Sequence, residues 1–241
     1  MAQLKDIVRV LYPPHCISCN EIVAEEGALC GPCRRNAVFL SGLCCDQCAA
    51  PLPGDADDAP TLCDQCTSVP RRWDHGRAAT LYSGTSRRVI LAIKHSGQSD
   101  VATALGQWVA SACTDLVSDT SVLVPVPLHW LRRLKRGYNQ SELIARVAAK
   151  QLGVPMVPNL LTRVRHGEMM KDMDRAARAS VLEGAFALNP RTKLKLAGRH
   201  VILIDDVMTT GATLDACTKV CLENGANRVS VAVVARVAKV S

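Results

Sequence analysis

The spacing of the cysteines restricts the fold of this 241-residue chain more than any other feature. Nine of the twelve cysteines fall between residues 16 and 66, where four pairs each have a two-residue spacer. Two thiolates spaced in this way hold one metal ion from a tight turn, and two pairs complete the tetrahedral sulfur set of structural zinc. The pattern predicts one or two structural zinc ions, with two favoured, held by Cys16, Cys19, Cys30, Cys33, Cys45, Cys48, Cys63 and Cys66.

Disulfide bonds and redox catalysis are the alternative uses of such pairs. Disulfides require an oxidising compartment, and the first residues lack the uninterrupted apolar stretch of an export signal. A redox site requires a single pair and does not explain four. Cys44 is left over in the cysteine-rich region, whereas Cys113, Cys217 and Cys221 lie in apolar segments and are expected to be ordinary buried thiols.

Residues 1–75 are expected to form a module of their own, with a short amphipathic helix over residues 1–11 ahead of the cysteines. The module has few large apolar side chains, so burial cannot offset the entropy of ordering about 60 residues. The metal therefore has to contribute folding free energy, which predicts closed, structural coordination.

The balance of charged residues also changes at residue 75. Residues 1–75 hold 6 Lys/Arg against 10 Asp/Glu, and residues 76–241 hold 23 against 12. A basic domain suits polyphosphates or nucleic acid, although a solvated surface with surplus arginine is the simpler interpretation. No stretch reaches the about 18 consecutive apolar residues of a membrane span, so a cytoplasmic location is the default expectation.

Residues 76–241 alternate apolar strands with amphipathic helices, which predicts an α/β domain with an open, mostly parallel sheet. Only 3% of the residues are aromatic, so the core is expected to consist of small aliphatic side chains, as under helices that cover a parallel sheet. Strands are predicted at residues 78–82, 122–126, 154–158, 201–205 and 229–234, and helices at 86–94, 101–116, 141–152 and 213–224. The polar segment 163–181 interrupts this alternation and is predicted to be a mobile flap.

Residues 201–213 concentrate the chemistry, because an apolar strand ends in two acids and runs through a small-residue turn into a helix. Hydroxyls, a glycine and the free N–H groups of a helix N-terminus are the parts of a phosphate site. The glycine spacings of a P-loop and of a dinucleotide fingerprint are both missing. Paired acids beside a phosphate site fit a sugar phosphate with a divalent ion. The alternative, a helix cap, explains one acid but hardly both.

This segment resembles the phosphoribosyl-pyrophosphate (PRPP) signature of type I phosphoribosyltransferases. The rest of the chain resembles the ComF family, which includes GntX-like proteins and in some bacteria serves natural competence, the uptake of DNA. The resemblance rests on the cysteine pairs and on segments 92–97, 125–129, 136–140, 184–186 and 201–213. It implies a type I phosphoribosyltransferase fold behind a double zinc ribbon.

The resemblance also implies roles for individual residues. Asp205 and Asp206 would meet the ribose 2′- and 3′-hydroxyls, and the 5-phosphate would be held by Thr209, Thr210, Gly211, Ala212 and Thr213. A pyrophosphate loop would consist of Pro125, Val126, Pro127, Leu128 and His129, although Pro-Val-Pro is also an ordinary end for a strand. The cluster of Arg132, Arg133, Lys135 and Arg136 just beyond it favours the diphosphate interpretation.

The activity that follows from the resemblance is Mg²⁺-dependent transfer of a phosphoribosyl group to an unknown acceptor. Arg165 and Arg178 are retained in the flap, but Gly167, Met170 and Val181 stand where the family tends to show Thr, Gln and Asn. Binding of PRPP is therefore better supported than a particular transfer reaction. Two alternatives stay open: a non-enzymatic single-stranded DNA uptake factor, which the scarce aromatic residues disfavour, and a PRPP-sensing regulator.

Overall fold

The computed structural model describes residues 12–55, 59–96, 99–128, 137–164, 182, 184–192 and 196–238. The elements are, in chain order, α2 (Gly31–Arg35), α3 (Asp64–Ser68), β1 (Gly76–Leu81), α4 (Gly84–Ser96), α5 (Ser99–Ala112), η1 (Thr114–Leu116), β2 (Ser121–Pro125), α7 (Gln140–Leu152), β3 (Leu161–Arg163), β4 (Phe186–Leu188), β5 (His200–Met208), α9 (Ala212–Glu223) and β6 (Arg228–Arg236). The helix expected over residues 1–11 lies outside the described residues.

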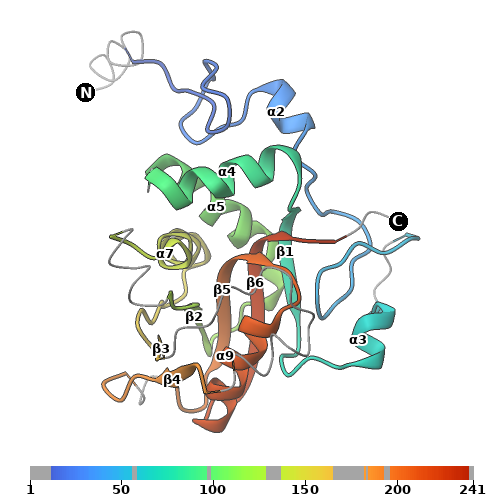
Figure 1. Ribbon diagram of the computed structural model, residues 1–241, viewed down its shortest axis with the longest axis vertical. Coiled ribbons are helices and arrows are strands. Elements are labelled where there is room, and N and C mark those ends of the chain that lie inside the picture. The colour runs from blue at the N-terminus through green and yellow to red at the C-terminus, as the bar shows by residue number, and fades with distance from the viewer. Residues whose placement is uncertain are drawn as a thin grey trace.

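The central sheet has the strand order β1-β6-β5-β2, and all three pairings are parallel (Figure 1). The predicted α/β class with an open parallel sheet is thus confirmed. Strand β5 is longer than expected, because its pairing with β6 continues to Met208↔Arg236, whereas its pairing with β2 ends at Pro125↔Ile204. Beyond Ile204, β5 therefore continues beside β6 after its pairing with β2 has ended.

The strand expected at residues 154–158 is reduced to one parallel bridge between Leu123 and Met156. Two hydrogen bonds remain there, because Leu123 N–H donates to the Pro155 carbonyl and Val157 N–H donates to the Leu123 carbonyl, both at 2.9 Å. Pro155 and Pro158 have no N–H group, so this segment cannot extend a ladder in either direction. The segment lies beside β2 at the edge of the sheet without forming a strand.

A two-stranded antiparallel sheet, not expected from the sequence, pairs β3 with β4. Arg163, taken as the first residue of the flap, lies in β3 opposite Phe186. Residues 165–181 of the expected flap, with Arg165 and Arg178, lie outside the described residues. The pairing places Arg163 opposite Phe186, and the Val164 amide donates to the Ala185 carbonyl at 2.8 Å, so residues that flank this segment on both sides lie next to each other.

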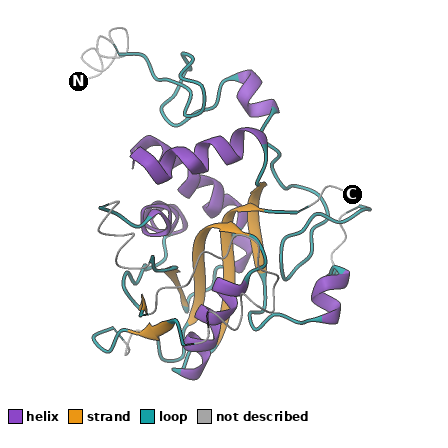
Figure 2. Cartoon of the chain, viewed as in Figure 1, coloured by secondary structure: helices purple, strands orange, loops and turns teal. Residues whose placement is uncertain are grey.

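Alternating side chains of the sheet divide the core into two layers. Ile202, Ile204 and Val234 pack with α4, α5 and α7, whereas Val201, Leu203 and Val231 pack with α9. Figure 2 shows these helices on both sides of the orange strands. Among the helices that the structure describes, none has the length and the apolar character needed to cross a membrane.

The cysteine-rich segment divides into two lobes that meet different parts of the sheet domain. The first lobe carries α2, and its Ile17 and Leu29 pack on the layer of α4, α5 and α7. The second lobe carries α3 (Figure 1). Its Cys45, Cys48 and Cys66 belong to the same apolar layer as α9. Residues on either side of position 75 thus share one hydrophobic core.

Candidate functional site

The turn between β5 and α9 has the geometry expected of a phosphate cradle. Gly211 is the N-cap residue of α9 and has φ 81°, a left-handed conformation that disfavours other residues. The Thr210 hydroxyl accepts a hydrogen bond of 3.4 Å from the Ala212 amide. A hollow of about 110 Å³ lies over this turn, lined by residues that include Asp205, Thr209, Thr210, Gly211, Ala212 and Thr213. The structure therefore brings six of the seven predicted PRPP residues together.

Asp205 is positioned from two directions. Its Oδ1 accepts a hydrogen bond of 2.9 Å from the Ser141 hydroxyl and one of 2.8 Å from the Asp206 amide. Ser141 lies in the first turn of α7, which begins after Asn139, and the Asn139 side chain accepts from the Ser141 amide at 3.2 Å. Sequence reasoning missed Ser141 as a partner of Asp205, because the two residues are 64 positions apart.

The described part of the predicted pyrophosphate loop follows β2 at the same edge of the sheet. The Val126 amide donates to the Ile204 carbonyl at 2.9 Å, and the Val126 carbonyl accepts from Asn139 Nδ2 at 3.0 Å. A second hollow, of about 130 Å³, is lined by residues that include Pro125, Pro127, Leu128, Asn139 and Arg163. His129, Arg132 and Arg136 lie outside the described residues.

The eight paired cysteines form two tetrads, and all twelve cysteines are free of disulfides. In each tetrad the four sulfur atoms lie within 4.8 Å of one another: Cys16, Cys19, Cys30 and Cys33 in the first, and Cys45, Cys48, Cys63 and Cys66 in the second. Tetrahedral zinc with Zn–S bonds of about 2.3 Å sets sulfur atoms about 3.8 Å apart. The Cys19–Cys30 and Cys48–Cys63 sulfur distances of 3.5 and 3.7 Å fit this value. The donor sets suit one zinc ion per tetrad.

The remaining cysteines are not part of these tetrads. Burial raises the pKa of Cys113 and of Cys221 to about 12 and raises that of Cys217 well above its usual range. In the second tetrad, by contrast, a hydrogen bond from Cys48 lowers the pKa of Cys45 to about 4. The same hydrogen bond raises the pKa of Cys48, so within this pair Cys45 is the favoured thiolate and Cys48 the thiol. The three later cysteines have raised pKa values and stay protonated.

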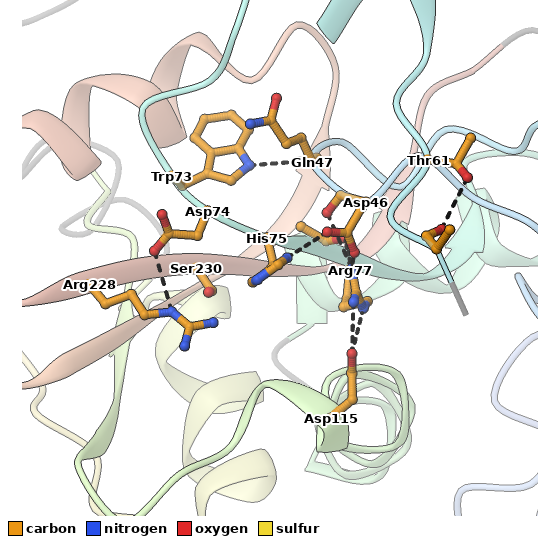
Figure 3. A network of polar contacts seen from close by, with 12 residues as sticks. Asp46, Gln47, Thr61, Trp73, Asp74, His75, Arg77, Asp115, Arg228 and Ser230 are labelled. Atoms are coloured by element: carbon orange, nitrogen blue, oxygen red, sulfur yellow. Dashed lines mark hydrogen bonds and ion pairs between the residues drawn. The ribbon is translucent and has the colours of Figure 1, made fainter. Parts of the chain in front are cut away.

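A polar network fixes the second tetrad lobe on the sheet (Figure 3). Asp46 accepts from His75 Nδ1 at 2.6 Å and from Arg77 Nη1 at 2.8 Å, and Arg77 Nη2 also reaches Asp115 at 2.7 Å. Burial would raise the pKa of Asp46, but the hydrogen bonds from Arg77 and His75 outweigh it and lower this pKa. Trp73 Nε1 donates to the Gln47 carbonyl at 2.6 Å. The lobe and strand β1 are thus joined by charged and neutral hydrogen bonds.

Two buried arginines, also missed in the sequence, connect this lobe to the turn before α9. Arg71 Nη1 donates to the Thr210 carbonyl at 2.6 Å, and Arg236 Nη1 donates to the Thr209 carbonyl at 2.5 Å. The partners are 139 and 27 residues apart in sequence, so no local pattern signals them.

Two family models match the chain. The double zinc ribbon domain matches residues 7–67, and the phosphoribosyl transferase domain matches residues 135–239. The two matches correspond to the lobes of the tetrads and to the part of the sheet domain that holds β5 and α9.

Curated relatives cover most of the chain. It is 29% identical to the DNA utilization protein YhgH of Salmonella typhi over 91% of this chain and 95% of that protein. It is 28% identical to competence protein F of Haemophilus influenzae over 90% and 94%, respectively. It is 25% identical to competence protein ComFC of Bacillus subtilis over 85% and 82%.

Among solved structures, the allosteric regulatory enzyme of purine biosynthesis is 17% identical with a TM-score of 0.40, over 60% of this chain and 30% of that chain. The two domain matches, in this order along one chain, agree with the relatives that cover nearly all of it. The chain thus joins a double zinc ribbon to a phosphoribosyl transferase domain, as its motifs predicted, and over most of its length it is similar to competence protein F and to competence protein ComFC.

Proposed function

We propose that the protein binds PRPP at the carboxyl edge of its parallel sheet and transfers the phosphoribosyl group to an acceptor. One observation carries the proposal: the Asp205 carboxylate, the left-handed turn at Gly211 and the N-terminus of α9 line a single hollow. A helix N-terminus favours a phosphate, and a fixed carboxylate beside it accepts sugar hydroxyls. Ligands of open α/β sheets bind at this edge.

In this proposal each group has its own part of the substrate. Asp205 and Asp206 accept the ribose hydroxyls, residues 209–213 hold the 5-phosphate, and residues 125–129 with Arg132 and Arg136 hold the diphosphate. Parallel pairing of β2 with β5 supports the arrangement, because it ends both strands at the same edge. Mg²⁺, which takes carboxylate and phosphate oxygens, would neutralise the leaving diphosphate.

Transfer by this site needs no covalent intermediate. The bond from the anomeric carbon to the diphosphate breaks with its electron pair on the diphosphate, and an acceptor nucleophile bonds to that carbon and gives up a proton. Excluding water protects the cationic ribosyl centre, which is the task of the flap with Arg165 and Arg178. The position of Arg163 beside Pro125 and Leu128 supports a flap that starts next to the pyrophosphate loop.

The proposal is tested by isothermal titration of the full-length protein with PRPP and Mg²⁺, followed by an assay of pyrophosphate release with nucleobases and nucleic acids as acceptors. Binding with release is the expected result. Binding without release would instead favour a PRPP-sensing regulator. Absence of binding would contradict the proposal.

DNA handling is the second candidate function, and the names of the relatives together with the charge of the sheet domain favour it. Residues 76–241 hold 23 Lys/Arg against 12 Asp/Glu. If this domain contacts DNA phosphates, the affinity for single-stranded DNA falls steeply with salt and is weakened by Arg132→Ala or Arg136→Ala. An affinity that does not change with salt would exclude phosphate contacts.

A further inference from the structure

Arg71 and Arg236 are buried cations without a carboxylate partner. Their exposed fractions are 6% and 5%, and within the described ranges no Asp or Glu lies within ion-pair distance of either. A buried guanidinium is costly unless an anion compensates it. Some other anion is therefore expected next to each of these side chains.

Within the described structure, the groups that can supply this negative charge are sulfur ligands of the second tetrad, and each arginine contacts one of them. Arg71 Nε donates to Cys66 Sγ at 3.5 Å, and Arg236 Nη2 lies 4.0 Å from Cys48 Sγ. Four thiolates around one Zn²⁺ carry a net charge of about −2. The charge of a metal-loaded second tetrad is thus opposite in sign and equal in number to the two buried positive charges.

Both guanidinium groups also donate hydrogen bonds to the turn that forms the phosphate cradle, through other nitrogen atoms than those that contact the sulfur ligands. Arg236 donates to the carbonyls of Met208 and Thr209 at 3.2 and 2.5 Å, and Arg71 donates to the Thr210 carbonyl at 2.6 Å. In a trans peptide the carbonyl and the next N–H point in opposite directions. Binding the carbonyls of Thr209 and Thr210 on the zinc side therefore turns the N–H groups of Thr210 and Gly211 away from it.

Those two N–H groups are available to an anion. Neither donates a hydrogen bond to another described residue. Gly211 is also in close contact with Arg71 and with Trp73, since a Cβ on it would lie 3.0 Å from Arg71 Nη1 and 2.8 Å from Trp73 Cη2. The backbone of the cradle is thus packed directly on the residues that contact the second tetrad.

We infer that the second zinc site is a positioning element of the phosphate cradle, with Arg71 and Arg236 as the residues that connect them. The metal cluster holds the arginines, the arginines hold the carbonyls of residues 208–210, and the freed N–H groups face the phosphate. Loss of this zinc ion then disorders the cradle and lowers its affinity for phosphate-bearing ligands. The inference rests on the proposed function for the identity of the ligand, but not for the link itself.

The first zinc site provides the matched control. Its sulfur ligand Cys33 lies 3.9 Å from Arg88 Nη2, and the other described partner of this nitrogen is the Thr85 hydroxyl, which donates to Asn36 Oδ1 rather than to a residue of the cradle. Cys30 and Cys63 form a matched pair, because both are half-buried ligands and both are the N-cap residue of a short helix. Removing either one is expected to release one zinc ion.

The experiment compares Cys63→Ser and Cys30→Ser in the full-length protein. Zinc content, hydrogen exchange of the peptide that spans residues 206–213, and affinity for PRPP with Mg²⁺ are measured for each variant. Both variants are expected to retain one zinc ion. Only Cys63→Ser is expected to show faster exchange in the cradle and PRPP affinity that is about ten-fold weaker or more, the effect of losing one charged hydrogen bond.

A second pair of variants leaves both tetrads intact. Arg71→Met removes the link while retaining most of the side-chain volume, and Arg88→Met is its control at the first site. Arg71→Met is expected to keep two zinc ions and to reproduce the faster cradle exchange. The inference would be overturned if the cradle exchanged as fast in Cys30→Ser as in Cys63→Ser, and as fast in Arg88→Met as in Arg71→Met.

Hydrogen exchange also distinguishes a failure of the proposed PRPP binding from a failure of the link between the second zinc site and the cradle. If the wild-type protein binds no PRPP but Cys63→Ser still exposes the cradle, the proposed ligand is wrong and the link stands. If PRPP binds and neither Cys63→Ser nor Arg71→Met alters cradle exchange or affinity, the proposed function stands and the link is wrong.

Discussion

The Ser141 hydroxyl donates a hydrogen bond of 2.9 Å to the Asp205 carboxylate and so joins the start of α7 to strand β5. Pairing of β5 with β2 ends one residue earlier, at Ile204, so this bond lies where β5 and β2 part. The same oxygen accepts from the Asp206 amide, which leaves the carboxylate little freedom to rotate. Asp205 is thus held in place before any ligand arrives.

Replacing both acids, Asp205→Asn with Asp206→Asn, is expected to weaken PRPP binding by about two orders of magnitude or more. Each charge-assisted hydrogen bond lost is worth about 1.5–3 kcal/mol, and amides are nearly the same size as the carboxylates. Titration calorimetry measures the loss, and thermal melting checks the fold. Asp119→Asn is the control, because this exposed residue precedes β2 at the opposite edge of the sheet. Wild-type affinity in the double variant would place the sugar-phosphate site elsewhere.

Adjacent cysteines test the metal assignment. Cys45 belongs to the second tetrad, whereas Cys44 belongs to neither, and burial raises the Cys44 pKa. Elemental analysis of protein purified without chelator is expected to give two zinc ions per chain for the wild type and for Cys44→Ser, and one for Cys45→Ser. Two zinc ions in Cys45→Ser, or folded wild-type protein without zinc, would contradict the assignment.

Stability is expected to fall as the pH drops below about 6.5, in part through His200. Burial and, next, the charge of Arg228 lower the pKa of His200, against the opposing effect of Asp74. The unfolded chain then binds a proton at a pH where the folded chain does not, so acid favours unfolding. One such group changes the free energy of unfolding by at most about 1.4 kcal/mol per pH unit.

The variant His200→Gln isolates this contribution, because acid also releases zinc from both the wild type and the variant. His200 accepts or donates hydrogen bonds with the hydroxyls of Ser121 and Ser230 at 3.1 and 3.0 Å, which an amide side chain can in part replace. Chemical denaturation at pH 7.5 and 5.5 should show a smaller acid loss for the variant. An identical loss in both proteins would mean that His200 does not contribute.

The local features of the sequence predicted most of the fold. Paired cysteines predicted the eight metal ligands, although not which four of them come together, and the apolar run into Asp205 and Asp206 predicted the strand that leads into α9. The sequence failed where structure depends on distant partners: prolines prevented a strand at residues 154–158, and β3 pairs with β4 across a gap of more than twenty residues. No local pattern distinguishes Arg71 and Arg236 in the sequence, because only the folded chain brings them between the tetrad and the turn.

Alanine substitutions at two glycines with similar φ angles distinguish the cost of backbone strain from the cost of a steric clash. Gly211 and Gly153 have φ 81° and 69°, and a Cβ on Gly153 would meet nothing within 4 Å, whereas on Gly211 it would lie 2.8 Å from Trp73. Alanine in the left-handed region costs about 1–2 kcal/mol, which is the whole expected loss of stability for Gly153→Ala. Gly211→Ala is expected to lose about 1–3 kcal/mol more, because overpacking moves Trp73, Arg71 or the turn itself.

The two variants should also differ in ligand binding. A displaced turn misplaces the N–H groups of the cradle, so PRPP affinity should fall in Gly211→Ala and stay unchanged in Gly153→Ala. Urea denaturation gives the two free energies of unfolding, and calorimetry gives the two affinities. Equal losses of stability would mean that Trp73 and Arg71 yield freely to the new methyl group, and the close packing of the zinc lobe on the cradle would then have no energetic consequence.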